Sequence, residues 1–565
     1  MDHKQVTLES VKKDLQQILA GVYSPSQLNT LIPKLMSVIK AHKQVGDKKQ
    51  WVDQNDIMLI TYGDSIQQSG QFPLQTLNEF LNQHAQDILS AVHILPCYPY
   101  TSDDGFSVVD YWKINPDLGD WGHVQALSQD YDLMFDGVIN HISKSSDWFQ
   151  GYLKGDETYR EFFTEANPER DYSSVTRPRA LPLLTQFETA HGTKHIWTTF
   201  SEDQVDLNFR CPEVFQKIVE LLLFYAGQGA TYIRLDAIGF MWKELDTPCI
   251  HQPQTHALVQ AMRAVMDAAA PHVKLITETN VPHKDNISYF GNGSNEAHLV
   301  YQFPLPPLTL HTLQTGNSDK IVEWMDSLEP CTENTTFFNF LASHDGIGVR
   351  PVEGILAKQQ VDHLVQVVTE NGGRVSFKDN GDGTQSPYEL NINYFDAISD
   401  ANASDAVNLD RFMAAQSILV SLAGVPGIYV HSLLGSGNDL EGLEKLGYNR
   451  AINREKLDRL TLDAELALPT TRRAQVLARF KQLLSVRKQH KAFSPNASQR
   501  VVKLSDQLIT LVRGEEVAVA INISDQAIEL DTRALLADVR RDLISGTAVE
   551  GVTELKPYQV MWLSK

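Results

Sequence analysis

The stretch Tyr232-Ile-Arg234-Leu-Asp236-Ala237 is a short, largely apolar run that carries two charged side chains near its end. A run of this length and composition is typical of a buried β-strand. Side chains two positions apart in a strand point to the same face, so Arg234 and Asp236 share one face. A buried pair of a cation and a carboxylate is costly unless it serves a purpose. The stretch therefore predicts a core strand whose end has a function.

Seven further runs of this kind are spread through the chain, and most of the gaps between them are long enough to hold a helix. The eight runs are, in order, Ile57–Tyr62, Val92–Cys97, Met134–Asn140, Tyr232–Ala237, Lys274–Asn280, His298–Phe303, Phe338–His344 and Ile428–His431. Strands that alternate with helices predict a parallel sheet in an α/β protein. Eight such units predict a closed (β/α)8 TIM barrel.

Two of the gaps are much longer than a crossover helix requires, residues 142–207 after the third run and residues 347–400 after the seventh. Both leave the carboxyl ends of strands, where a TIM barrel builds its active site, so we expect two loop-insertion subdomains there. Residues 1–50 have helical spacing and predict a helical lead-in. Short strand-like runs in residues 493–565 predict a C-terminal antiparallel β domain, which leaves residues 51–492 for the catalytic barrel.

The composition is that of a soluble globular protein, because 42% of the 565 residues are hydrophobic and 21% are charged. Asp and Glu (70 residues) outnumber Lys and Arg (49 residues), which gives a formal net charge of −21. Nucleic acid and anionic membranes are bound by clustered cations, so this balance argues against both as partners. No run of about 18 apolar residues could span a membrane, and no apolar segment follows the first residues. We therefore expect a cytoplasmic protein.

Metal sites and disulfides are not expected. The four cysteines, Cys97, Cys211, Cys249 and Cys331, are far apart and form no CxxC pair. That usage fits a reducing compartment. No Asp-rich loop has the spacing of a calcium site. We therefore predict that the protein uses neither a metal nor a cofactor.

Three of the predicted strands have a carboxylate side chain at or next to their carboxyl end. Asp236 ends the fourth strand, Glu278 lies near the end of the fifth, and Asp345 directly follows the seventh. Because parallel strands of a barrel end on one side, the three side chains should converge. Retaining glycosidic chemistry needs such a set: a nucleophile, a proton donor that later removes a proton, and a group that stabilises the transition state. Each residue alone would also fit a helix N-cap or a structural ion pair, but their combination favours catalysis.

Four short motifs at the predicted strand ends resemble those of the α-amylase superfamily, glycoside hydrolase family 13. They are Asp136-Gly-Val-Ile-Asn140-His141, Arg234-Leu-Asp236-Ala237, Glu278 and His344-Asp345. The resemblance implies that Asp236 is the nucleophile, Glu278 the general acid/base and Asp345 the transition-state stabiliser. It further implies that Arg234 supports the nucleophile and that two histidines, His141 and His344, bind glucose hydroxyls.

A narrower resemblance, to the sucrose phosphorylase subfamily, covers nearly the whole chain. It rests on the stretches Phe338–Val349, Arg177-Pro-Arg179, Asn449–Arg454 and Asp103-Asp104-Gly105-Phe106. In that subfamily phosphate replaces water in the second step, so phosphate is implied as a co-substrate and α-glucose 1-phosphate as a product. The implied contacts are Asp104 and Arg450 with the glucose, Gln204 nearby, and Arg179 and Tyr388 with the acceptor or the incoming phosphate.

The sequence departs from the sucrose enzymes at positions near the acceptor. Asn280 stands where they carry a histidine, Phe240 where they carry a tyrosine, and the loop of residues 385–391 does not have an aspartate and a glutamine at the positions expected to hold fructose. Several stretches look more like the glucosylglycerate phosphorylases, namely Arg177–Leu184, Gly239–Glu244, Glu278–Asn286, Ser386–Asn391 and the N-terminal lead-in.

The nature of the acceptor is the main alternative that stays open. An anionic acceptor such as glycerate suits arginine, and Arg179 and Arg350 are candidates for that contact. Glu389 indicates the opposite, because a carboxylate in the acceptor loop suits a neutral polyol such as glycerol. Glucosylglycerate phosphorylase is the favoured interpretation, with glucosylglycerol phosphorylase and sucrose phosphorylase as alternatives.

The predicted reaction is the reversible phosphorolysis of an α-glucoside with net retention, through a β-glucosyl-enzyme on Asp236. The two insertions would exclude water as lids, and the loop Gly381–Asn391 is the segment expected to move. A hydrolase or transglucosidase with the same site is a more distant alternative. A non-enzymatic barrel that serves as a binding module would require a lost nucleophile or acid. The oligomeric state stays open, with a homodimer as one option.

Overall fold

The computed structural model describes residues 7–42, 51–380 and 383–565. Residues 1–6 and 43–50 of the predicted helical lead-in lie outside this range, as do residues 381 and 382 of the loop that we expect to move.

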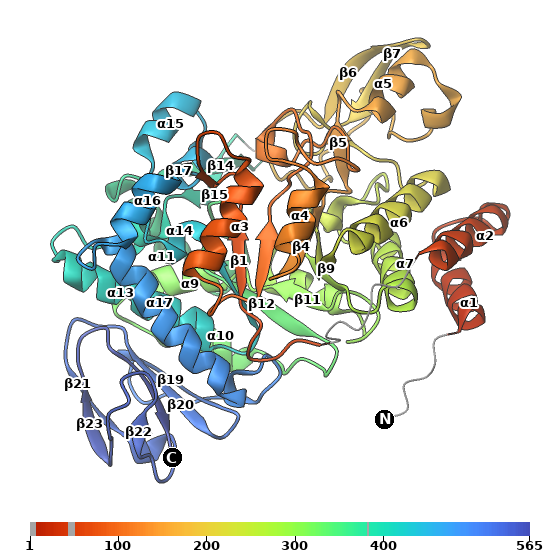
Figure 1. Cartoon of the computed structure of the whole chain (residues 1–565). Helices are drawn as coiled ribbons and strands as arrows, with labels where there is room; N and C mark the ends of the chain where they lie inside the picture. Colours follow the sequence, from red (N-terminus) through yellow and green to blue (C-terminus); the bar gives the residue numbers. More distant parts are fainter. Residues whose placement is uncertain (1–6, 43–50, 381–382) are drawn as a thin grey trace.

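Eight strands close into a barrel at the centre of the molecule (Figure 1). They are β1 (Met58–Thr61), β3 (Ala91–Ile94), β4 (Asp132–Gly137), β9 (Ala230–Leu235), β10 (Lys274–Thr277), β11 (Leu299–Tyr301), β12 (Thr336–Phe340) and β16 (Val425–Tyr429). Their order around the barrel is β1-β16-β12-β11-β10-β9-β4-β3, and each neighbouring pair is parallel. Each strand overlaps one of the eight apolar runs, and the predicted TIM barrel is confirmed.

Helices surround the barrel and bury the outer faces of its strands. Between successive strands lie α3 (Pro73–His84), α4 (Trp121–Leu127), α6 (Pro212–Gly227), α7 (Pro253–Ala269), α8 (His283–Ile287), α9 (Leu305–Thr315), α10 (Asp319–Ser327) and α13 (Asp405–Ser421). After β16 come α14 (Val430–Leu433), α15 (Leu440–Leu446), α16 (Arg459–Leu466) and α17 (Arg472–Gln489). All residues of β9 are buried, as expected for a parallel strand that is covered on both faces.

The two predicted insertions leave the barrel after β4 and β12. The first contains β5 (His141–Ser143), α5 (Asp147–Lys154), β6 (Leu184–Thr189), β7 (Gly192–Trp197) and β8 (Gln204–Asp206), with antiparallel pairs β5–β8 and β6–β7. The second contains β13 (Ile347–Gly348), α11 (Lys358–Glu370), β14 (Arg374–Asp379), β15 (Gln385–Asn391) and α12 (Tyr394–Ile398). In its small antiparallel sheet, β15 lies between β13 and β14.

The two ends of the chain add separate elements (Figure 1). Helices α1 (Leu8–Leu19) and α2 (Pro25–Ala41) each begin at a capping box and pack beside α6 and α7. At the other end, β18 (Gln499–Val501), β19 (Leu508–Arg513), β20 (Val517–Asn522), β24 (Val560–Ser564) and β22 (Arg541–Asp542) form one antiparallel sheet, and β21 (Ile528–Asp531) pairs with β23 (Val552–Leu555). The predicted C-terminal antiparallel domain is confirmed. The exact limits of the domains stay a prediction.

In the part of the chain that the structure describes, no helix is both long enough and apolar enough to cross a membrane.

Candidate active site

The ends of β9 and β10 carry two neighbouring carboxylates. Asp236 directly follows β9, and Glu278 directly follows β10. The backbone N–H of Asp236 donates to the Gly137 carbonyl at 3.1 Å, and that of Glu278 donates to the Leu235 carbonyl at 3.1 Å. The hydrogen bonds of the barrel thus continue through both residues, and the two side chains leave the barrel at the same edge.

One guanidinium group, that of Arg234, contacts the carboxylates at this edge. Its Nη1 lies 2.9 Å from Asp236 Oδ1 and also binds Asp136, and its Nη2 lies 3.8 Å from Glu278 Oε2. Burial lowers the pKa of Arg234, but the surrounding carboxylates outweigh burial and hold it well above its usual range. Arg234 is therefore a fixed cation that two of the predicted catalytic groups share.

Asp136 holds Arg234 in place from within the barrel wall. Its Oδ2 accepts a hydrogen bond from His93 Nε2 at 2.6 Å, while its Oδ1 accepts from Arg234. Burial would raise the pKa of Asp136, but Arg234 and His93 outweigh burial and lower it to about 2. Asp136 therefore stays ionised and orients the arginine for its other partners.

The protonation of Asp236 and Glu278 is set by the same surroundings. Burial raises the pKa of each carboxyl, and nearby carboxylates, chiefly Glu278 for Asp236 and Asp345 for Glu278, raise it further against the effect of Arg234. A proton retained by this pair belongs on Glu278, because Arg234 lies 2.9 Å from Asp236 but 3.8 Å from Glu278. An ionised nucleophile beside a protonated acid is the division of roles that a retaining mechanism needs.

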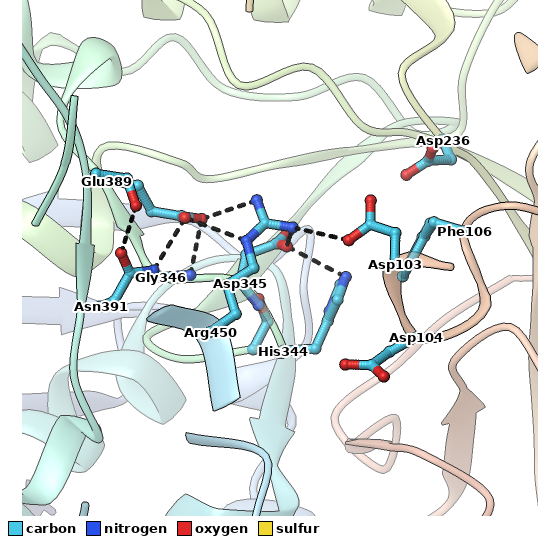
Figure 2. Close-up of polar contacts among 12 residues, drawn as sticks. Asp103, Asp104, Phe106, Asp236, His344, Asp345, Gly346, Glu389, Asn391 and Arg450 are labelled. Atoms are coloured by element: carbon cyan, nitrogen blue, oxygen red, sulfur yellow. Dashed lines mark hydrogen bonds and ion pairs between the residues drawn. The ribbon is translucent and has the colours of Figure 1, made fainter. Parts of the chain in front are cut away.

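Asp345, which follows β12, completes the group of carboxylates (Figure 2). Its Oδ1 lies 2.8 Å from Arg450 Nη1 and 3.4 Å from His344 Nε2. The His344 ring stacks on Phe106, with the ring centres 4.9 Å apart and the planes 6° apart. Burial and the neighbouring arginines hold the pKa of His344 well below its usual range, so the ring is neutral at neutral pH. A neutral imidazole can bind a hydroxyl without repelling the arginines.

His141 and Gln204 come from the first insertion and meet beside the same Phe106. His141 Nε2 donates to the Phe106 carbonyl at 2.8 Å, and Gln204 Nε2 donates to that carbonyl at 3.2 Å. Gln204 Nε2 also lies 3.1 Å from Asp103 Oδ2. Burial lowers the pKa of His141. The pairing of β5 with β8 therefore brings two predicted sugar contacts together.

The structure distinguishes two adjacent aspartates that the sequence analysis could not. Asp104, the predicted sugar contact, has its Oδ2 bound by Tyr448 and Arg454. Asp103 instead points toward Asp236 and Arg450 (Figure 2), and its pKa is lowered by Arg179 and other arginines against burial. Both residues adopt a left-handed backbone, with φ of 53° for Asp103 and 46° for Asp104. The inward position in this structure therefore belongs to Asp103, which sequence reasoning missed.

A cavity of about 470 Å³ adjoins these residues, and its lining carries three arginines and three carboxylates. The lining includes Asp103, Asp104, Arg179, Gln204, Tyr388, Glu389, Arg450 and Arg454. Arg179 donates to Asp103 at 3.0 Å and lies over the ring of Phe200. Burial raises the pKa of Tyr388 to about 12, so its hydroxyl keeps its proton and can donate to an anion. Arg350, the other arginine considered for the acceptor, is not among the lining residues and lies 3.7 Å from Glu353.

Glu389 is the predicted site residue whose surroundings differ most from expectation. We expected its carboxylate to face the acceptor, but the residue is only 4% exposed, and Arg450 binds both carboxylate oxygens at 3.0 and 3.1 Å. The carboxylate of Glu389 is thus engaged by the protein. The sequence could not indicate this pairing, because the two residues are 61 positions apart.

A buried lysine that sequence reasoning also missed ties the first insertion to the barrel. Lys243 Nζ lies 2.7 Å from Asp206 Oδ2 and 3.2 Å from Asn140 Oδ1. Asp206, which is fully buried, also accepts hydrogen bonds from Thr199 and Asn140. Because Asp206 lies opposite His141 in the β5–β8 pair, this ion pair supports a predicted sugar contact.

Replacing Lys243 by methionine is expected to destabilise the protein by about 3–5 kcal/mol, because it leaves the Asp206 carboxylate buried without a counterion. The midpoint of thermal unfolding, measured by calorimetry, should fall accordingly. Lys217→Met is the matched control, since its ion pair with Glu220 is solvent-exposed and contributes about 1 kcal/mol or less. Equal midpoints for the two variants would show that the buried ion pair contributes no more to stability than the exposed one.

No group of three or more His, Cys, Asp or Glu side chains within residues 7–42, 51–380 and 383–565 is arranged to hold a metal ion. The four cysteines are free, as the spacing predicts. The absence of a metal and of a cofactor from the reaction stays a prediction.

Comparison with known proteins places this chain in a family. The model of the α-amylase catalytic domain matches residues 86–367. Glucosylglycerate phosphorylase of Allomeiothermus silvanus is 48% identical, over 96% of each chain, and that of Escherichia coli is 44% identical, over 97% of this chain and 98% of the relative. The crystal structure of sucrose 6F-phosphate phosphorylase from Thermoanaerobacter thermosaccharolyticum shares the fold, with a TM-score of 0.72 and 24% identity over 83% of this chain and 94% of the other.

Proposed function

The chain belongs to the α-amylase family and is a glycoside phosphorylase, and from this premise we propose that its substrate is 2-O-α-glucosylglycerate. The proposed reaction converts this glucoside and phosphate, reversibly, into α-glucose 1-phosphate and glycerate. The observation that carries the choice of substrate is the identity of 44–48% with two glucosylglycerate phosphorylases over nearly the full length of both chains. Arg179, which lines the cavity, supports it, because its remaining N–H donors can bind glycerate or phosphate, which are both anions.

In the first half of the proposed reaction, Asp236 attacks the anomeric carbon of the glucosyl group. The bond between that carbon and the glycerate oxygen breaks, and Glu278 donates its proton to the leaving oxygen. The product is a β-glucosyl ester of Asp236. Asp345, which lies beside His344, would stabilise the positive charge that develops on the sugar ring, and Arg234 keeps the nucleophile ionised and oriented by its contact at 2.9 Å.

In the second half, an oxygen of phosphate attacks the same carbon from the side that glycerate has left. The ester bond to Asp236 breaks, Glu278 recovers a proton from the phosphate, and α-glucose 1-phosphate is released with net retention. Arg179 and the Tyr388 hydroxyl are the groups that we propose to hold the phosphate, because both line the cavity and both can donate hydrogen bonds.

The proposed choice of glycerate over glycerol follows from charge. A free Glu389 carboxylate would suit a neutral polyol, but Arg450 binds that carboxylate at 3.0 and 3.1 Å. The hydrogen bond of Arg179 to Asp103 uses one of its five N–H donors, so others remain for an anion. Arg179 is therefore the group in the cavity that favours an anionic acceptor.

Reverse phosphorolysis tests the substrate. The protein is mixed with α-glucose 1-phosphate and, in separate samples, with glycerate, glycerol, fructose or no acceptor, and the release of phosphate is followed. We expect fast release with glycerate and slow release in the other samples. Fast release with glycerol or fructose would overturn the proposed substrate but would remain consistent with phosphorylase activity. Equal release in all samples would mean that water is the acceptor and that the protein acts as a hydrolase.

A further inference from the structure

Arg450 joins the two halves of the candidate site (Figure 2). Its Nη1 lies 2.8 Å from Asp345 Oδ1 and 4.0 Å from Asp103 Oδ1, on the side of the sugar. Its Nε and Nη2 donate to the two carboxylate oxygens of Glu389 at 3.1 and 3.0 Å, on the side of the acceptor loop. This fork-to-fork pairing fixes the plane of the guanidinium as well as its position.

Glu389 has no acceptor capacity left for a substrate in this arrangement. Besides the two bonds from Arg450, its Oε1 accepts from the Gly346 N–H at 2.8 Å and its Oε2 from Asn391 Nδ2 at 3.0 Å. An ionised carboxylate has about four such sites, and all four partners are donors. The side chain is 5% exposed.

Three of the four bonds converge on Asp345. The two from Arg450 reach it through that arginine, and the third comes from the backbone N–H of Gly346, the residue that directly follows it. The approach is so close that a Cβ atom at position 346 would lie 2.6 Å from Glu389 Cγ. Glu389 therefore holds Asp345 both through its side-chain partner and through its backbone.

We propose that Glu389 is a positioning residue for the chemical step, which acts by orienting Arg450 and Asp345, and that it does not hydrogen-bond the acceptor although it lines the cavity. The proposal rests on the proposed function, because Asp345 matters here as the group that stabilises the transition state. If the Arg450 guanidinium were displaced, Asp345 would also be misplaced, and every reaction of the site would be slowed, whatever the acceptor. A residue that bound the acceptor would affect only the steps in which the acceptor takes part.

Glu389→Gln is the sharpest variant, because glutamine has the same shape. Its amide NH₂ would face two donors in either orientation, since each carboxylate oxygen accepts two hydrogen bonds here. Glu389→Asp, which keeps the charge on a shorter side chain, is the rescue variant. Glu370→Gln makes the same chemical change on an exposed helix end and is the matched control.

The measurement is the exchange of labelled phosphate into α-glucose 1-phosphate without any acceptor, compared with synthesis from glycerate. We expect Glu389→Gln to slow the exchange at saturating substrates by at least about tenfold. The kcat of synthesis should fall by a similar factor, and the KM for glycerate should stay within about twofold of the wild-type value. Glu389→Asp should recover part of the loss, and Glu370→Gln should behave as the wild type.

Normal exchange together with a raised KM for glycerate would overturn the proposal and make Glu389 an acceptor contact. Normal exchange with normal synthesis would overturn it as well. Absence of exchange in the wild-type protein would count against the double displacement itself, so failure of the proposed function is distinguishable. Thermal unfolding of each variant shows whether a loss of activity comes from a loss of the fold. Asn391→Ala, which removes one of the four hydrogen bonds to Glu389, serves as a milder second test.

Discussion

Replacing Asp236 by asparagine is expected to slow phosphorolysis by at least about 10⁴-fold while the fold is retained. An amide cannot form the glucosyl ester, so no residual route uses the same intermediate. The amide oxygen can still accept the hydrogen bond that Arg234 donates to Oδ1 at 2.9 Å, so the surrounding ion pairs keep a partner. The rate is measured as phosphate-dependent formation of α-glucose 1-phosphate, and as exchange of phosphate without acceptor.

The control for Asp236→Asn is Asp362→Asn, the same change on the exposed side of α11. That variant should keep the wild-type rate. If Asp236→Asn retained more than about a hundredth of the wild-type rate in both assays, Asp236 would not be the nucleophile.

Replacing Glu278 by glutamine is expected to slow cleavage of glucosylglycerate by about 10²–10⁴-fold. The glycerate oxygen leaves as an alkoxide unless it is protonated, whereas phosphate is a good leaving group without help. Cleavage of α-glucose 1-phosphate, measured as phosphate exchange or as arsenolysis, should therefore lose much less activity than cleavage of the glucoside. An equal loss with both donors would exclude Glu278 as the acid.

The pH dependence gives a second readout for Glu278. Burial, with the help of Asp345, raises the pKa of Glu278 above its ordinary value of 4.5. Cleavage of the glucoside needs the protonated form, so kcat/KM should fall as the pH rises through this raised pKa. The Glu278→Gln variant cannot lose that proton, and the alkaline limb of its profile should disappear. A limb that persisted unchanged in the variant would belong to another group.

The barrel and its carboxylates could be predicted from the sequence because local patterns determine them. Each apolar run is long enough for a strand, and the polar residue that ends it lies where parallel strands meet. Arg234 and Asp236 illustrate this, since their spacing alone indicates that they share a face, and the structure has them in contact.

The contacts between distant segments could not be predicted in the same way. Whether Asp103 or Asp104 points inward depends on backbone angles that two adjacent aspartates do not reveal. The partners of Lys243 and Glu389 lie on other loops, and no periodicity links them. These residues fix the outer part of the site. The candidate catalytic carboxylates could therefore be predicted from the sequence, whereas the residues that position them could not.

The shared counterion Arg234 has a consequence for the order in which substrates bind. In the free protein, the ionised carboxylates Asp136 and Asp236 flank this guanidinium, and their negative potential opposes the entry of a phosphate dianion. Once Asp236 carries a glucosyl ester, one of these negative charges is gone while the charge of Arg234 remains. Phosphate and glycerate, both anions, should then bind the glucosyl-enzyme more tightly than the free enzyme. If the proposed double displacement operates, this arrangement of charges would favour the binding of phosphate or glycerate after the glucosyl group has been transferred.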